Sequence, residues 1–276
     1  MDITAVALLE EARLAAGLRE ISAHVLELSS GGVACRGEPG AWNNMAAGLG
    51  MRGPVERREI DEIVAWYRDA GIEPRIELCP LADASVRTHC DELGFGLRQF
   101  ENVLYRLLPP DEVIRPAQAP AREVRVRVVD PSDDGDVRVC ARISMTGFTP
   151  PGHVCSDADV ALSVRMLTHP RVRGFVASVE EDGRWVDVSA GALELNGEVG
   201  ALFALSTLHA YRGLGAQQVL IAARLNLARE RGVKVVTIGS RPGAGTERNV
   251  RRMGFQTAYT KAVLALRGDG LVPARG

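Results

Sequence analysis

The chain has 276 residues, of which 46% are apolar and 25% charged, and its formal net charge is −2. This length predicts one large or two ordinary domains, and the composition is typical of a soluble globular protein with a sizeable core. The near-neutral charge argues against a broad nucleic-acid-binding surface. The sequence has no apolar run long enough to span a bilayer and acidic residues near its start, so we expect a cytoplasmic protein without a signal peptide.

Apolar periodicity and turn residues predict the elements of the first half. In chain order these are a helix over 1–28, a Gly-rich connection with room for a short strand over 29–40, an apolar stretch over 42–49, a helix over 54–70, a strand over 74–79, a helix over 83–93 and a strand over 95–108. Residues 109–122 contain four prolines, which is typical of a linker between domains.

The second half is predicted in the same way. It reads as a strand over 124–129, helices over 132–145 and 156–167, hairpin strands over 174–179 and 185–195, a strand over 199–205, a helix over 216–229, a strand over 233–239, a helix over 246–253 and a strand over 255–266.

The five cysteines are odd in number and form no CxxC pair. Cys79 lies in an apolar strand and Cys140 on an apolar helical face. We therefore expect buried thiols, without a disulfide framework and without a metal site.

Three dipeptides recur at an offset of about 160 residues: Gly-Phe at 94 and 254, Val-Leu at 103 and 263, and Arg-Gly at 52 and 212. The order of predicted strands and helices around them also matches. Two copies of one fold explain both observations, and the alternative is a coincidence of common dipeptides.

The stretch over 206–217 combines a buried strand, a turn with Arg212, Gly213 and Gly215, and a helix. The first N–H groups of a helix lack internal partners and carry partial positive charge, so this turn could bind phosphate; a plain strand-to-helix turn is the alternative. It matches neither the Walker loop nor the dinucleotide fingerprint. At the matching place the first copy has Pro54, which lacks an N–H, and Glu56, which repels anions, so we expect no phosphate site there.

The residues YRGLGAQ (211–217) and RMGF (252–255) resemble the GNAT superfamily of acetyl-CoA-dependent N-acetyltransferases over about residues 124–267. The first half looks like a degenerate copy, so the whole chain resembles tandem-GNAT proteins. The resemblance implies an α/β fold with two domains, each a mixed sheet flanked by helices. These would be a degenerate domain over 1–108, a linker over 109–122 and an acetyl-CoA-binding domain over 123–270.

The resemblance also implies where the cosubstrate acetyl-CoA binds. The family pattern falls on Arg212 and Gly215 and departs at Gln217, whose backbone N–H still serves. The pyrophosphate would lie at Arg212, Gly213, Leu214, Gly215, Ala216 and Gln217. The pantetheine arm would lie along the backbone of Leu205, Ser206 and Thr207, with Asn249 nearby.

The implied chemistry is direct acetyl transfer from the thioester to an amine. Glu194 and His209 are candidates for the base, although a solvated carboxylate and a turn-capping histidine are ordinary alternatives. The position of the usual tyrosine acid is Val250. Asn249 beside it can donate a hydrogen bond, and Tyr259 could substitute as the acid. His153, Cys155 and residues 42–45 could face an acceptor or simply lie in a loop and a packed cleft.

We therefore expect an N-acetyltransferase that acts on the amine of a small molecule, with no nucleic-acid or membrane partner; the chain could form a homodimer. A non-catalytic acyl-CoA-binding or regulatory module is the alternative, motivated by the missing tyrosine. A transferase that uses charged tRNA is the least favoured of the three because of the near-neutral charge.

Overall fold

The computed structural model describes residues 1–150 and 154–274 and divides into two compact units. The first unit comprises Met1–Val103 and Thr257–Gly276, and the second comprises Leu104–Gln256. The sequence predicted domains over 1–108 and 123–270. In the structure, the last strand of the chain belongs to the first unit and not to the second.

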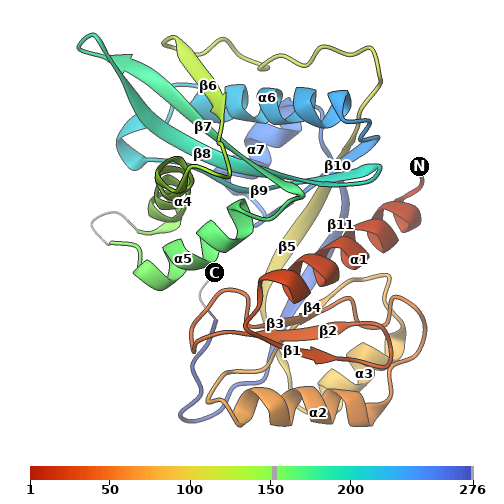
Figure 1. Cartoon of the computed structure of the whole chain (residues 1–276). Coiled ribbons are helices and arrows are strands. Elements are labelled where there is room, and N and C mark those ends of the chain that lie inside the picture. Colours follow the sequence, from red (N-terminus) through yellow and green to blue (C-terminus); the bar gives the residue numbers. More distant parts are fainter. Residues whose placement is uncertain (151–153, 275–276) are drawn as a thin grey trace. The chain divides into compact units, whose positions relative to one another are not determined.

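The first unit is a sheet with helices on both faces (Figure 1). Its elements are α1 (Ile3–Ile21), β1 (His24–Glu27), β2 (Val33–Arg36), β3 (Met45–Ala47), α2 (Arg57–Arg68), β4 (Arg75–Leu78), α3 (Ala84–Glu92), the first part of β5 (Gly96–Leu107) and β11 (Gln256–Ala265). The strand order is β1-β2-β3-β4-β11-β5. The helix expected over 1–28 ends at Ile21, because Ser22 is extended and the residues after it pair as β1 with β2.

The second unit is built in the same way, with α6 and α7 on one face of its sheet and α4 and α5 on the other (Figure 1). Its elements are β6 (Val124–Val128), α4 (Asp134–Phe148), α5 (Asp157–Leu167), β7 (Val172–Glu181), β8 (Arg184–Asn196), β9 (Val199–Thr207), the 3-10 turn η1 (His209–Tyr211), α6 (Ala216–Glu230), β10 (Val235–Ser240) and α7 (Gly245–Arg252). The strand order is β5-β10-β9-β8-β7-β6.

The second half of the chain gives its last strand to the first unit, and the end of β5 belongs to the second unit. β11 follows α7 in the sequence but pairs antiparallel with β4, where Ala265 lies opposite Arg75. The strand beside β10 in the second unit is β5, which ends the first half. The strands β1-β2-β3-β4 of the first unit thus correspond to β7-β8-β9-β10 of the second, as the sequence repeat implies.

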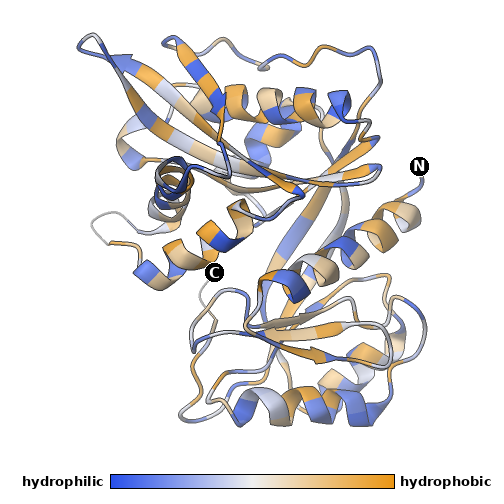
Figure 2. Cartoon of the chain, in the orientation of Figure 1, coloured by the Kyte–Doolittle hydropathy of each residue, from blue (hydrophilic) through white to orange (hydrophobic). Residues whose placement is uncertain are grey.

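Successive side chains of a strand point to opposite faces of the sheet, so the second unit has two hydrophobic cores. Phe175, Ala177 and Val179 pack with α6, whereas Val172 and Val176 pack with α4 and α5. The helices accordingly carry both hydrophobic and hydrophilic residues (Figure 2). All five cysteines are buried and unpaired, as expected. None of the helices among the described residues is long and apolar enough to cross a membrane.

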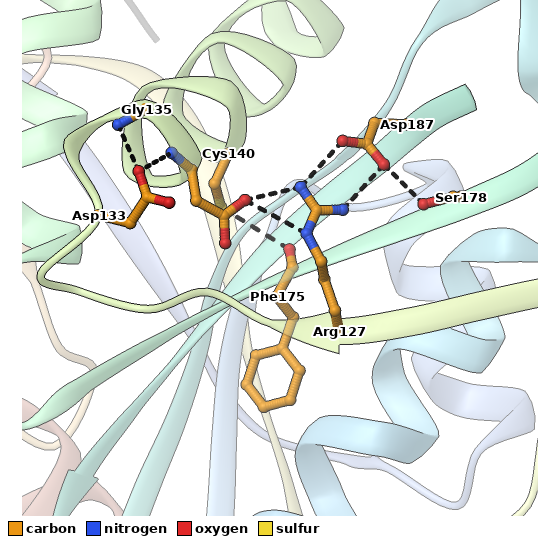
Figure 3. A network of polar contacts seen from close by, with 8 residues as sticks. Arg127, Asp133, Gly135, Cys140, Phe175, Ser178 and Asp187 are labelled. Atoms are coloured by element: carbon orange, nitrogen blue, oxygen red, sulfur yellow. Dashed lines mark hydrogen bonds and ion pairs between the residues drawn. The ribbon is translucent and has the colours of Figure 1, made fainter. Parts of the chain in front are cut away.

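An arginine on β6 fastens α4 to the sheet (Figure 3). The guanidinium of Arg127 bonds Asp136 on α4 at 2.7 Å and Asp187 on β8 at 2.8 Å. Asp133 caps the start of α4, and the Cys140 thiol donates to the Phe175 carbonyl at 3.7 Å. α4 is thereby fixed against the strands that lead to the candidate site.

Residues 109–122, expected as a linker, pack against α6 instead of standing free; we call them the connecting segment. The Ile114 N–H donates to Asn226 at 3.0 Å, and Asn226 donates back to the Ile114 carbonyl at 2.8 Å. The Gln118 N–H donates to the Gln218 side chain at 3.0 Å. This segment is therefore part of the surface around the N-terminal end of α6.

Candidate cofactor-binding site

β9 separates from its parallel neighbour β10 part-way along its length. The last paired residues are Leu202 and Ile238, whereas β9 stays paired with β8 through Thr207, opposite Ser189. In the described part of the chain, residues 203–207 therefore have one backbone edge that no strand of the second unit fills. Such an edge can hydrogen-bond an extended ligand.

A β-bulge lies at the point where the two strands separate. The register places residues 204 and 205 of β9 opposite the single residue Gly191 of β8. Ala204 has a φ of 51°, in the left-handed region that residues with a side chain seldom adopt. A bulge bends its strand and re-aims the backbone groups beside it, which is how β9 turns away from β10.

The turn between β9 and α6 presents a set of backbone donors. Gly213 and Gly215 have φ values of 83° and 90°, which glycine adopts without strain, and Gly215 is the N-cap of α6. Gln218 and Val219 donate to the Gly215 carbonyl. The N–H groups of residues 213–217 make no backbone hydrogen bond within the described ranges, so they fit an anion such as a pyrophosphate.

The connecting segment lies on the carbonyl side of this turn. The Ala121 N–H donates to the Leu214 carbonyl at 3.1 Å. The C=O and N–H of one trans peptide point in opposite directions, so the Gly215 N–H points away from Ala121. The contact with the connecting segment therefore does not use the donor side of the turn.

The side chains of Arg212 and His209 tie the turn to the end of α4. Arg212 donates to the carbonyls of Gly147 at 2.9 Å and Thr207 at 3.3 Å. His209 Nε2 lies 3.0 Å from the Thr149 carbonyl, so Nε2 carries the proton and Nδ1 is the nitrogen that could accept one. Cationic or donor side chains at a helix C-terminus satisfy its last carbonyls, which gives both residues a structural task.

Asn249 joins α7 to α6 beside the turn. Its Nδ2 donates to Gln217 Oε1, and its Oδ1 accepts from Gln218 Nε2 at 3.4 Å. Gln217 also donates to the Thr246 hydroxyl at 3.4 Å. The structure thus brings together the predicted residues 205–207, 212–217 and Asn249, whose roles as a binding site stay predictions.

The candidate base Glu194 lies away from this group along the sheet. It is opposite Ala201 on β9, before the strands separate, and its carboxylate is buried and ion-paired with Arg171 at 3.4 Å. Glu194 and His209 are therefore at different ends of β9, and the structure does not bring them together.

Val250 and Tyr259 are the two residues that bear on the missing acid. Val250 is fully buried in the core of the second unit. Tyr259 belongs to the first unit, where its hydroxyl donates to Glu11 at 2.6 Å and burial raises the pKa of the phenol well above its ordinary value. Val250 has no proton to donate, and the Tyr259 hydroxyl is already bonded to Glu11.

Cys155, His153 and residues 42–45 were the other residues expected to face an acceptor or to pack. Cys155 is buried beside the Thr146 hydroxyl, and His153 lies outside the described residues. In residues 42–45, Asn44 is buried and bridges Gly37 and Glu38. Within the described ranges, no group of three or more His, Cys, Asp or Glu side chains could hold a metal ion.

In the corresponding turn of the first unit, one backbone N–H and the carboxylate of Glu56 already have partners within the protein. The Val55 N–H donates to the Ser85 hydroxyl at 2.9 Å, and the Glu56 carboxylate pairs with Arg58 at 2.7 Å. Because Pro54 also lacks an N–H, this turn has fewer free donors than residues 213–217, and the absence of a phosphate site in this copy stays a prediction.

Sequence reasoning missed two features next to the site. The first is the connecting segment, whose polar and proline-rich composition gives no sign that it packs on α6. The second is Arg224 on α6, which is fully buried. Its position four residues after the buried Leu220 places a charge on the apolar face of the helix, and this spacing was the available signal.

Comparison with known proteins identifies the fold. No protein-family model matches the sequence, and no curated protein matches it either. Among solved structures, a GCN5-related N-acetyltransferase from Kribbella flavida is similar at a TM-score of 0.67 and 19% identity, over 95% of this chain and 97% of that one.

Two further structures are similar over most of the chain. A tandem GNAT protein from the clavulanic acid biosynthesis pathway has a TM-score of 0.56 at 13% identity, covering 85% of this chain and 76% of that one. The C-terminal domain of a putative lysylphosphatidylglycerol synthetase from Agrobacterium fabrum has a TM-score of 0.54 at 13% identity, covering 96% and 93%. The chain therefore has the fold of GCN5-related N-acetyltransferases, as the resemblance implied.

Proposed function

We propose that this chain is an N-acetyltransferase that transfers the acetyl group of acetyl-CoA directly to the amine of a small molecule. One observation carries the proposal: β9 leaves β10 immediately before a turn that presents the N–H groups of residues 213–217. An open strand edge suits the amide-bearing pantetheine arm, and the turn suits a pyrophosphate. Acetyl-CoA supplies both groups and the thioester.

The protein's contribution to the reaction would be binding, orientation and proton removal. Holding the amine against the thioester accounts for much of the acceleration in such a transfer. The N–C bond forms, the C–S bond breaks and a base takes the amine proton, for which His209 Nδ1 and Glu194 remain the candidates. A thiol of ordinary pKa, about 8.5, leaves as a thiolate without a dedicated acid, so the absence of a tyrosine at Val250 is compatible with turnover.

The variant Gln217→Glu tests acetyl-CoA binding at the turn. It keeps the size of the side chain and the acceptor for Asn249 but adds a negative charge in the first turn of α6. We expect an affinity for acetyl-CoA at least about tenfold weaker by calorimetry, because like charges repel at short range. Gly215→Glu is a poorer test, since a Cβ there would lie 2.8 Å from Pro120 Cα.

The matched control is Gln256→Glu, the same change at an exposed position at the start of β11. It should leave the affinity unchanged. If Gln217→Glu binds acetyl-CoA as tightly as this control does, the pyrophosphate does not lie at the turn.

A non-catalytic acyl-CoA-binding module is the second candidate. It is favoured by Val250, which is fully buried in the place of the family's tyrosine, and by Tyr259, which is bonded to Glu11. Release of free thiol from acetyl-CoA, measured across a panel of small amines, separates the two. Binding without amine-dependent thiol release above the rate of hydrolysis would favour the non-catalytic module.

A further inference from the structure

Arg224 is a buried cation in the core of the second unit. It is fully buried, and among the described residues no carboxylate pairs with it. Burial lowers the pKa of its guanidinium to about 9. Burying an unpaired charge is costly, so a guanidinium kept in such a place calls for a compensating task.

Its hydrogen bonds join α6 to the bulge between β8 and β9. Nη1 donates to the carbonyl of Ala192 on β8 at 3.1 Å and to that of Phe203 on β9 at 3.5 Å. Nε donates to the Leu220 carbonyl one turn earlier on α6, at 3.2 Å. Ala192 and Phe203 are the register partners that border the bulge, so one side chain holds both of its strands at this point.

The residue opposite the bulge is Gly191, and Arg224 lies close to it. A Cβ on Gly191 would lie 2.8 Å from Arg224 Nη1 and 3.0 Å from its Cζ. A side chain at this position would therefore force the guanidinium of Arg224 to shift away from its present hydrogen bonds. Gly191, the bulge and Arg224 therefore form one arrangement.

We propose that Arg224 is a positioning residue that holds the bulge of β9, and with it the strand edge over residues 203–207, in the shape that accepts the pantetheine arm. Ala204 has a left-handed φ of 51°, a strained conformation that persists only where surrounding contacts hold it. The bonds to Ala192 and Phe203 supply such contacts. This inference rests on the proposed function for its ligand, whereas the link between Arg224 and the bulge does not.

The test compares two ligands on one variant. Arg224→Met keeps an unbranched side chain but loses the bonds to the two carbonyls, and Arg231→Met, at the exposed end of α6, is the control. Acetyl-CoA has a pantetheine arm, whereas adenosine 3′,5′-bisphosphate has none. We expect Arg224→Met to bind acetyl-CoA about tenfold more weakly and the bisphosphate within about twofold of the wild type. Arg224→Lys, which can still donate to one carbonyl, should recover part of the loss.

The outcomes are distinct. Equal weakening of both ligands, or no weakening of acetyl-CoA in a folded variant, would overturn the positioning role. A second measurement needs no ligand: the backbone chemical shifts of Ala204 and Leu205 should move toward those of a regular strand in Arg224→Met and stay in place in Arg231→Met. Unchanged shifts would overturn the link between Arg224 and the bulge. A wild-type chain that binds no acetyl-CoA would refute the proposed function, and the shifts would still decide this link.

Discussion

Single residues in the first unit show how burial changes what a side chain can do. Lys261 is 2% exposed and bonds Glu11 at 2.9 Å, and Tyr259 donates to the same carboxylate. Lys261 also approaches Glu77 at 3.6 Å, and Arg75 pairs with Glu77 at 2.9 Å. These opposite charges share one buried network, which compensates the cost of removing them from water.

Glu101 lies near the charges of this network, and we expect it to make stability depend on pH. Burial and then the charge of Glu77 raise the pKa of Glu101 to about 7, against the opposing effects of Lys261 and Arg75; Glu10 raises it further. The folded state therefore holds a proton that the unfolded chain releases near pH 4.5, so stability falls as pH rises from there to about 7. Glu101→Gln removes this loss.

In urea unfolding, the advantage of Glu101→Gln over the wild type should grow by about 1 to 3 kcal/mol between pH 5 and pH 8. Glu62→Gln, an exposed change on α2, is the control and should differ from the wild type by less than about 0.5 kcal/mol at both values. An advantage of Glu101→Gln that is the same at both pH values would contradict the raised pKa.

At the scale of elements, the turn before α6 depends on two glycines whose surroundings differ. Both have a left-handed φ, but a Cβ on Gly213 meets nothing within 4 Å, whereas a Cβ on Gly215 would lie 2.8 Å from Pro120 Cα. Gly213→Ala should therefore cost about 1 to 2 kcal/mol through backbone strain alone. Gly215→Ala should cost more, because it also pushes away the connecting segment.

Limited trypsin digestion can detect this difference at Arg122, the arginine of the connecting segment that is not followed by proline. Gly215→Ala should be cut there faster than both Gly213→Ala and the wild type. Equal cutting of the two variants would mean that the segment is not held by its contact with Gly215.

Most elements could be predicted because their signals are local. Helix α2 follows from apolar residues at helical spacing, and β7 and β8 from runs of apolar residues closed by a Gly-containing turn. The helix expected over 1–28 was too long because residues 24–27 pair with β2, and this pairing is not visible in the periodicity of α1. The bulge at Ala204 could not be predicted either, because it depends on a guanidinium from another element.

At the scale of the whole molecule, the second half of the chain supplies β11 to the first unit. A chain that ends at residue 255 loses β11, and with it the partner of β4 and the cation Lys261 beside Glu11 and Glu77. We expect the first unit of this truncated chain to unfold, although the whole first half of the sequence is present. Hydrogen exchange of the amides in β3 and β4 should then lose its protection.

A chain that ends at residue 267 keeps β11 and is the control. It loses the bridge between Ile72 and Val272, so a small loss of protection is expected next to β4. Protection of β4 that survives in the chain ending at 255 would contradict a structural role for β11.

The sequence by itself determined the order of strands and helices, the repeat of about 160 residues, the turn at 212–217 and the fold that these imply. Each of these depends on neighbouring residues or on regular spacing, which the chain displays directly. Only the tertiary structure decided which unit receives β11, how the connecting segment packs, why Tyr259 is bonded to Glu11 and what Arg224 holds. Those features depend on contacts between residues far apart in the sequence, and the local sequence around a side chain does not indicate which distant residue it contacts.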